Sequence, residues 1–256
     1  MSGACVAPGR QSLHALAWLA RVGAAPFEVV QLVLGCSRVR AHDHVRRLAA
    51  AGFVRRAPMT RGDGSLIVLT PRGALMAGYP ANYAPRSVAP TTWAHASACA
   101  WVSAWLELRG RTWSGERELL HDDAWRYQLT YEDHRGTARG THHPDLGVFI
   151  DPGPVAIEVE LQRKSAARMR GICNMYARLT DEPDALLAGV IYVTNRPDVA
   201  ATINRFAWHV GLTSPAISFR TLDLVIEQTR AAADAHGSRA ASRMSPRSTS
   251  AAAPAG

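Results

Sequence analysis

Acidic side chains gather on two neighbouring segments of the chain, in a pattern that suits metal binding. The segment 155–161 reads VAIEVEL, so that apolar residues alternate with Glu158 and Glu160. Because successive side chains of a strand point to opposite faces, both glutamates lie on the same face. Two carboxylates so close together need solvent, basic partners or a metal ion to stay ionised. Asp145 opens the preceding strand, and a turn at residues 151–154 brings it near Glu158.

Three carboxylates that converge at a strand end predict a magnesium site. Mg²⁺ prefers oxygen ligands and keeps positions open for phosphate oxygens, which is what metal-assisted phosphodiester cleavage requires. We expect Asp145 and Glu158 to hold the ion, with Glu116 as a further carboxylate and Glu107 as its competitor. The alternative is a charge cluster without catalysis, whose members pair with one another on the sheet face. Its members are Glu158, Glu160, Arg163 and Lys164.

The elements that must position these carboxylates can be read from the apolar periodicity of residues 92–229. Helices are expected at 92–108, 165–179 and 198–211. Strands are expected at 112–119, 147–150, 155–161, 186–193 and 216–219, with a polar excursion or hairpin after the first. This order, αβββαβ with a further helix and strand, predicts an α/β (α+β) sandwich around a mixed sheet.

The carboxylate motif resembles the core of the PD-(D/E)XK nucleases. Pro144-Asp145, a spacer and then Glu158-Val-Glu160 stand where that superfamily has its motif. The resemblance implies a restriction-endonuclease-like fold in which Asp145 and Glu158 hold the metal. The third position of the triplet is normally Lys, which orients or activates the attacking water, whereas this sequence has Glu160. Lys164, the only lysine among 29 basic residues, is the candidate substitute, and an ammonium differs from a guanidinium in its chemistry.

A wider set of motifs along the chain is similar to the replication-relaxation family. It comprises an N-terminal winged helix, WSGEREL at 113–119, His143-Pro-Asp145, the motif from Glu158 to Ser165, and Tyr176. The family occurs with plasmids and mobile elements, and the resemblance implies a role in plasmid replication and DNA relaxation. A relaxase-like attack by Tyr176 is not favoured, because the sequence has no three-His metal motif. His142 and His143 are candidates for phosphate contacts, although paired loop histidines are commonly just exposed.

The first eighty residues predict a winged helix-turn-helix. A first helix follows Ser12, an available N-cap, with Leu13, Leu16, Ala17 and Ala20 at helical spacing. A second helix fits 27–34 and is closed by Gly35. A third, capped by Ser37, has a stripe of Ala41, Val45 and Leu48 and ends at Gly52. Runs at 53–58 and 65–69 then form a hairpin, and Thr70-Pro71 starts a further helix.

Arginines on the outer side of the third helix predict a DNA-binding face. Arg38 and Arg40 lie in its first turns, where base contacts arise, and Arg pairs well with guanine. The remaining candidates are expected to contact phosphates or to lie on the same face of the domain. They are His42, Arg46, Arg47, Arg55, Arg56 and Arg61. The alternative is a helical mini-domain with a solvated arginine face. Winged helices often bind two-fold sites as pairs, so a homodimer is a candidate assembly on double-stranded DNA.

The net charge of +8 is distributed unevenly along the chain. Residues 1–87 carry eleven arginines against three acidic residues, a balance of +8. Residues 88–229 carry 14 basic and 17 acidic groups, and residues 230–256 carry four and one, giving −3 and +3. A basic front end favours a polyanionic partner. We expect a winged helix at 1–80, a linker at 81–91, a nuclease-like domain at 92–229 and a disordered basic tail at 230–256.

The remaining composition excludes several classes of protein. No run of eighteen apolar residues exists, which argues against a transmembrane helix, and residues 1–10 lack the pattern of a signal peptide. Four cysteines lie far apart without a CxxC pair, which is typical of reduced thiols in the cytoplasm. The sequence therefore predicts a cytoplasmic DNA-binding protein. It acts either as a Mg²⁺-dependent nickase or as a non-catalytic regulator of replication, transfer or transcription.

Overall fold

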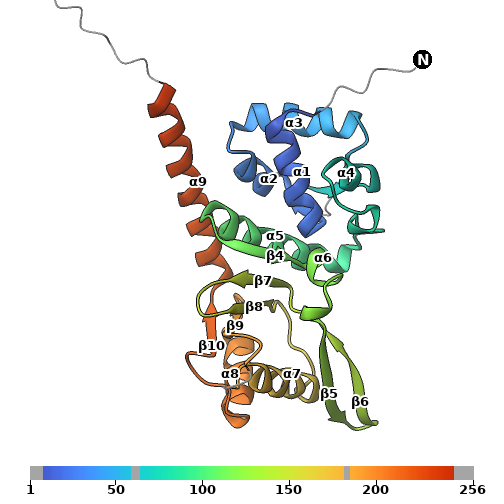
Figure 1. The fold of residues 1–256 in the computed structure, drawn as a ribbon, viewed down its shortest axis with the longest axis vertical. Coiled ribbons are helices and arrows are strands. Elements are labelled where there is room, and N and C mark those ends of the chain that lie inside the picture. The colour runs from blue at the N-terminus through green and yellow to red at the C-terminus, as the bar shows by residue number, and fades with distance from the viewer. Residues whose placement is uncertain (1–7, 59–63, 182–184, 245–256) are drawn as a thin grey trace, which may run out of the picture.

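The first part of the chain is a winged helix-turn-helix, as the sequence predicts (Figure 1). The computed structural model describes residues 8–58, 64–181 and 185–244. The helices of this part are α1 (Arg10–Val22), α2 (Phe27–Leu34), α3 (Arg38–Ala50) and α4 (Pro71–Met76). The strands are β1 (Ala24–Pro26), β2 (Val54–Pro58) and β3 (Ser65–Leu69). They form an antiparallel sheet in the order β1-β3-β2.

Local signals in the sequence account for most of these boundaries. The Ser37 side chain accepts a hydrogen bond from the Arg40 amide and starts α3, whose buried residues are Ala41, Val45 and Leu48. Gly35 ends α2 in the left-handed conformation that glycine favours. Thr70 caps α4 in the same way as Ser37 caps α3.

The first helix differs from the prediction in its start and in its buried face. It begins at Arg10, and Ser12 lies inside it with its hydroxyl 2.8 Å from Nδ1 of His44. Leu13 is exposed, whereas Trp18 and Leu19 are buried. The larger apolar side chains decide which face is buried, and Ser12 is accommodated there because its hydroxyl has a partner. Strand β1 was not predicted, because Ala-Ala-Pro carries no strand signal of its own.

The second part is built on a mixed five-stranded sheet, which confirms the predicted fold class (Figure 1). Its strands are β4 (Thr112–Gly115), β7 (Leu146–Phe149), β8 (Pro154–Val159), β9 (Gly189–Val193) and β10 (Ile217–Arg220). They lie in the order β10-β9-β8-β7-β4, antiparallel from β4 to β8 and parallel from β8 to β10. The predicted excursion is a separate hairpin of β5 (Tyr127–Asp133) and β6 (Gly136–His142).

Helices cover both faces of this sheet. They are α5 (Trp93–Leu108), α6 (Glu116–Leu119), α7 (Ala166–Leu179), α8 (Pro197–His209) and α9 (Leu222–Met244). Short 3₁₀ turns lie at Ala81–Tyr83, Pro90–Thr92 and Asp123–Trp125. Helix α5 lies between the sheet and the winged helix, and α7 and α8 lie on the opposite face (Figure 1). None of the helices in the described ranges combines the length and the apolar character that a membrane crossing requires.

Strand β8 shows why both faces of the sheet are buried. Val155, Ile157 and Val159 join the core on the α5 side, and Ala156 joins the core on the α7 side. The predicted alternation therefore holds, and it directs Glu158 toward α7. The strand ends at Val159, so Glu160 lies just beyond it.

The winged helix and the sheet share one hydrophobic core. That cluster contains Leu16 and Val45 of the winged helix, Trp101 of α5 and Ile157 of β8. At the junction, the Arg21 guanidinium lies 3.5 Å from the centre of the Trp113 ring and donates to Glu118 Oε2 at 2.8 Å. The predicted limits of the two domains stay a prediction, since this core runs across them.

Two predicted segments end differently in the structure. The predicted strand 112–119 stops at Gly115 and turns into α6, because the Glu118 carboxylate accepts the Gly115 amide at 3.0 Å. The tail expected to be disordered over residues 230–256 is helical as far as Met244, and residues 245–256 lie outside the described residues. Its alanines cannot build a core, but alanine is the best helix former. At the first residue of the predicted tail, the Arg230 guanidinium pairs with Glu28 of α2 at 2.8 Å.

Glycine is required at position 115. A Cβ there would lie 2.2 Å from the Arg21 carbonyl oxygen, so β4 can approach α1 only without a side chain. We expect Gly115→Ala to lower the free energy of unfolding by about 1–3 kcal/mol, the usual cost of overpacking. Gly140→Ala, where a Cβ meets nothing within 4 Å, is the matched control. Urea denaturation of both variants checks this, and equal loss of stability in the two would contradict it.

Candidate functional site

Asp145 lies at the start of β7 and is fixed there from two sides. Its backbone amide donates to the Ile157 carbonyl at 3.1 Å, and its Oδ2 accepts the Val159 amide at 2.7 Å. These bonds hold the carboxylate against β8 and direct Oδ1 toward α5. Oδ1 lies 3.1 Å from Nε2 of His95.

His95 and Cys99 face Asp145 from one side of α5. They are four residues apart, so the helix places both on one face. The Cys99 Sγ lies 3.5 Å from Nε2 of His95. The hydrogen bond to Asp145 raises the pKa of His95 despite its partial burial. Burial raises the pKa of the Cys99 thiol well above its usual value, and the charges of the nearby carboxylates raise it further.

Glu116 lies near enough to Asp145 to be affected by its charge, and its role as a further ligand stays a prediction, whereas its competitor Glu107 contacts other residues. Burial raises the pKa of Glu116, and the charge of Asp145 raises it further. Glu107 instead accepts the Trp113 indole N–H at 2.8 Å and pairs with Arg21 at 3.8 Å. It therefore connects α5 with α1 and β4.

Glu158 is buried on the other side of the sheet, with 2% of its surface exposed. Its Oε1 lies 2.6 Å from Nε2 of His142 and accepts a short hydrogen bond from the Tyr176 hydroxyl. Burial raises its pKa, but the charge and hydrogen bond of His142, the charge of Lys164 and the bond from Tyr176 together lower it. The sequence pattern called for a basic partner or a metal ion, and this carboxylate has a basic partner.

Glu160 and Lys164 form an ion pair with each other. The carboxylate of Glu160 is buried just beyond β8, and Lys164 reaches back to it from the segment before α7. Arg163 instead pairs with Asp198 at 3.0 Å, on the surface. The expectation of a mutually paired charge cluster therefore applies to Glu160 and Lys164 and does not extend to Arg163.

The ligand atoms that come together are not the predicted ones. Among the described residues, His95, Cys99 and Asp145 form a group whose ligand atoms all lie within 4.8 Å of one another. Asp145 is shared with the predicted magnesium set, but Glu158 is occupied by His142 and Tyr176. A nitrogen, sulfur and oxygen group is not the all-oxygen set that Mg²⁺ prefers. The predicted magnesium site thus remains a prediction that this donor set does not fit.

Two residues of the site, His95 and Cys99, were missed by the sequence reasoning. His95 and Cys99 have the i, i+4 spacing of residues on one helix face, which could have paired them but not placed them beside Asp145. His142 was expected to be exposed, yet it is buried at the end of β6. Tyr176 is completely buried, so it cannot reach a phosphate.

The predicted DNA-binding residues lie on the surface of the winged helix. All those in the described ranges are exposed, namely Arg38, Arg40, His42, Arg46, Arg47, Arg55 and Arg56. Arg61 lies outside the described residues. The His42 ring stacks on Phe27 with centroids 4.0 Å apart. The Arg56 guanidinium reaches the same place, 3.4 Å from His42 Nδ1 and 5.9 Å from the Phe27 ring centre.

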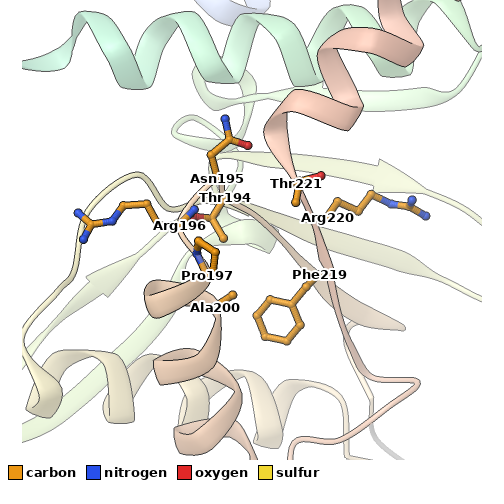
Figure 2. Close-up of a pocket in the computed structure, with 8 residues that line it drawn as sticks. All are labelled: Thr194, Asn195, Arg196, Pro197, Ala200, Phe219, Arg220 and Thr221. Carbon is orange, nitrogen blue, oxygen red and sulfur yellow. The ribbon is translucent and has the colours of Figure 1, made fainter.

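A separate pocket of about 210 Å³ lies where the parallel strands β9 and β10 end (Figure 2). Its lining includes Thr194, Phe219 and Ala200, and the side chains of Arg196 and Arg220 point away from one another and out of it. The Arg196 guanidinium is paired with Asp198 at 2.9 Å. The pocket contains none of the predicted site residues.

Comparisons with known proteins include a structural neighbour. No family model and no curated protein matches the chain, so the resemblance to the replication-relaxation family stays a prediction. The structure is similar to that of protein VC1899 from Vibrio cholerae, with a TM-score of 0.33 and 12% sequence identity. The match covers 89% of this chain and 57% of that one, so this chain spans less than two thirds of its neighbour's length.

The hydrogen bond from Tyr176 to the ionised Glu158 predicts a pH-dependent contribution to stability. Because the pKa of Glu158 is lowered on folding, its contribution is present above the unfolded pKa and is lost as pH falls through the folded pKa. We expect Tyr176→Phe to cost about 1.5–3 kcal/mol at neutral pH, the usual value of a bond to a charged group. The cost should shrink in acid, as Glu158 becomes protonated. Denaturant unfolding at several pH values measures it.

Tyr192→Phe is the matched control for this experiment. Tyr192 is equally buried, and its hydroxyl has no hydrogen-bond partner among the described residues. Removal of that hydroxyl should therefore cost little at any pH. A loss that is the same for both variants, or that does not change with pH for Tyr176→Phe, would show that Glu158 gains nothing from the bond.

Proposed function

We propose that this protein binds double-stranded DNA through the winged helix-turn-helix, with α3 in the major groove. The observation that carries the proposal is the division of α3 into two faces. Ala41, Val45 and Leu48 are buried in the core, whereas every arginine of the helix is exposed. A recognition helix needs this division, because one side must pack on the domain while the other reaches base edges and phosphates.

The stack on Phe27 gives the exposed face a defined shape. The Arg38 guanidinium lies 6.0 Å from the Phe27 ring centre, and Arg56 approaches the same ring from β2. His42 stacks on the same ring. Basic groups from α3 and from β2 therefore come together at the start of α3. First-turn residues of a recognition helix supply most base contacts, so Arg38 and Arg40 are the proposed base readers.

The distribution of charge supports the same partner. Residues 1–87 carry a balance of +8, residues 88–229 carry −3 and residues 230–256 carry +3. Neutralisation of phosphates by a concentrated basic surface releases counterions and provides affinity that does not depend on sequence. Solubility alone would not require such a division between the two parts of the chain.

The biological setting that we propose is replication or relaxation of plasmid and mobile-element DNA, in the cytoplasm. It is supported by the resemblance of the motifs around Asp145 and Glu158 to the replication-relaxation family, and a homodimer on a two-fold site fits the same mode of binding. A non-catalytic regulator of replication, transfer or transcription remains the alternative.

A second candidate function is metal-dependent nicking of DNA by the sheet domain. It is favoured by the αβββαβ order, which brings Asp145, Glu116 and Lys164 close enough to influence the same histidine, His95. This arrangement resembles the nuclease core from which the sequence motif comes. Two observations weigh against it: Glu158 is buried and hydrogen-bonded, and Lys164 is paired with Glu160.

The exposed arginines predict two different effects on DNA binding. We expect the double variant Arg38→Ala, Arg40→Ala to bind its specific site more weakly, with little change in nonspecific binding. Each lost base contact should remove about 1–3 kcal/mol of the free-energy difference between the correct and a wrong base. Arg56→Ala should instead lower the slope of log affinity against log salt by about 0.9 for one lost phosphate contact. Fluorescence anisotropy with a selected site and with random duplex, at several salt concentrations, measures both.

Two variants control for the loss of charge. Arg55 neighbours Arg56 on β2, so strand alternation turns it to the opposite face, and Arg55→Ala should change the slope less. Arg135→Ala removes one charge from the exposed turn between β5 and β6 and should leave binding unchanged. The placement of the DNA-binding face is wrong if all the variants bind like the native protein.

Nicking can be tested separately from binding. With Mg²⁺ or Mn²⁺ and supercoiled plasmid, the native protein should produce open circles, and Asp145→Asn should abolish them without loss of DNA binding. Asparagine keeps an oxygen for the Val159 amide but removes the charge. Absence of metal-dependent nicking by the native protein, with binding intact, would leave the non-catalytic function.

A further inference from the structure

We propose that His95, Cys99 and Asp145 form a binding site for a transition-metal ion of the Zn²⁺ and Co²⁺ class. The three residues offer one nitrogen, one sulfur and one oxygen, all within 4.8 Å of one another. The site depends neither on the proposed DNA binding nor on nicking, and it can be tested without DNA.

Two of the separations between donor atoms are close to those around a four-coordinate ion. Ligands at the usual Zn–N, Zn–O and Zn–S lengths in a tetrahedron lie about 3.4 Å apart for N···O and about 3.6 Å apart for N···S. The observed separations are 3.1 Å from His95 Nε2 to Asp145 Oδ1 and 3.5 Å from His95 Nε2 to Cys99 Sγ. The third separation, from the Asp145 carboxylate to Cys99 Sγ, lies within the 4.8 Å that holds for the whole group.

The fold holds these donors in place before any ion arrives. His95 and Cys99 stand one turn apart on α5, whose following residues are buried in the core. Asp145 is fixed by the Val159 amide through Oδ2, which leaves Oδ1 directed at His95. Such outer hydrogen bonds orient metal ligands and raise their affinity. The side chains of His95 and Asp145 are 39% and 18% exposed, which gives an ion a route from solvent.

The local charge favours a cation. The Asp145 carboxylate lies beside His95 and the buried Cys99 thiol. A divalent ion would compensate this negative charge, since a bound cation is commonly the largest charge in a site. Glu116 or a water molecule would complete the coordination.

The nature of the donors selects the class of ion. A thiolate and an imidazole are ligands for Zn²⁺ and related first-row ions, whereas Mg²⁺ and Ca²⁺ take oxygen. On binding, the Cys99 S–H bond breaks, a metal–sulfur bond forms, and the thiol proton passes to solvent. His95 likewise gives up any proton on Nε2. Affinity should therefore rise with pH.

Cobalt provides a direct test. The full chain, freed of metal with a chelator, is titrated with Co²⁺ and followed by ultraviolet and visible absorption. We expect one Co²⁺ per chain, with a near-ultraviolet thiolate-to-cobalt charge-transfer band. Cys99→Ser should abolish the band, and Cys173→Ser should keep it, because that equally buried thiol lies in the other core. Absence of the band in the native protein, or its persistence in Cys99→Ser, would overturn the proposal.

Zn²⁺ affinity gives a second measurement that does not depend on the cysteine variant. Competition with a chromophoric chelator should show that Asp145→Asn and His95→Gln each weaken Zn²⁺ binding by about 10-fold or more. Far-ultraviolet circular dichroism should show that both variants are folded. Unchanged Zn²⁺ affinity in both folded variants, or Mg²⁺ that displaces Zn²⁺ at equal concentration, would mean that the three residues are only a hydrogen-bonded cluster.

Discussion

The packing of α5 against two partners at once is the constraint on which the rest of the structure depends. Its residues 98–106 are all buried, so the helix is apolar on every side, as expected for a helix enclosed in a core. One side packs on the winged helix and α9, and another on β4, β7 and β8. The relative position of the two parts of the chain is thus set by apolar burial. The ion pairs of Arg21 at the junction lie at the edge of this core.

The sequence predicts α2, α3 and the wing well because local and tertiary signals agree there. Ser37, Gly35 and Thr70 supply caps, and the Ala41, Val45 and Leu48 stripe is the face that the core buries. Where the two kinds of signal differ, the prediction fails. The predicted strand at 112–119 stops at Gly115, where the Glu118 carboxylate accepts the Gly115 amide and also pairs with Arg21, a residue far away in the sequence.

The candidate site was predicted in part, for the same reason. Alternation along β8 correctly separates Glu158 from Val159, and the register of β7 and β8 brings Asp145 beside β8. Periodicity predicts which face of a strand or helix a side chain lies on, but it does not predict which residues pack against that face. The partners of Glu158 come from β6 and α7, and those of Asp145 come from α5. Only the tertiary fold brings such distant segments together.

Just beyond β8, the buried Glu160 carboxylate and Lys164 form an ion pair. A buried carboxylate at that position needs a cation, and the only lysine of the chain supplies it. The Lys164 ammonium is therefore committed to Glu160, as His142 is to Glu158. With these two carboxylates in contact with protein partners, Asp145 is left beside His95 and the buried Cys99 thiol. The proposed metal site therefore lies on the α5 side of the sheet, around Asp145, and not at Glu158 or Glu160. There the donor atoms, rather than the motif, determine which ion fits.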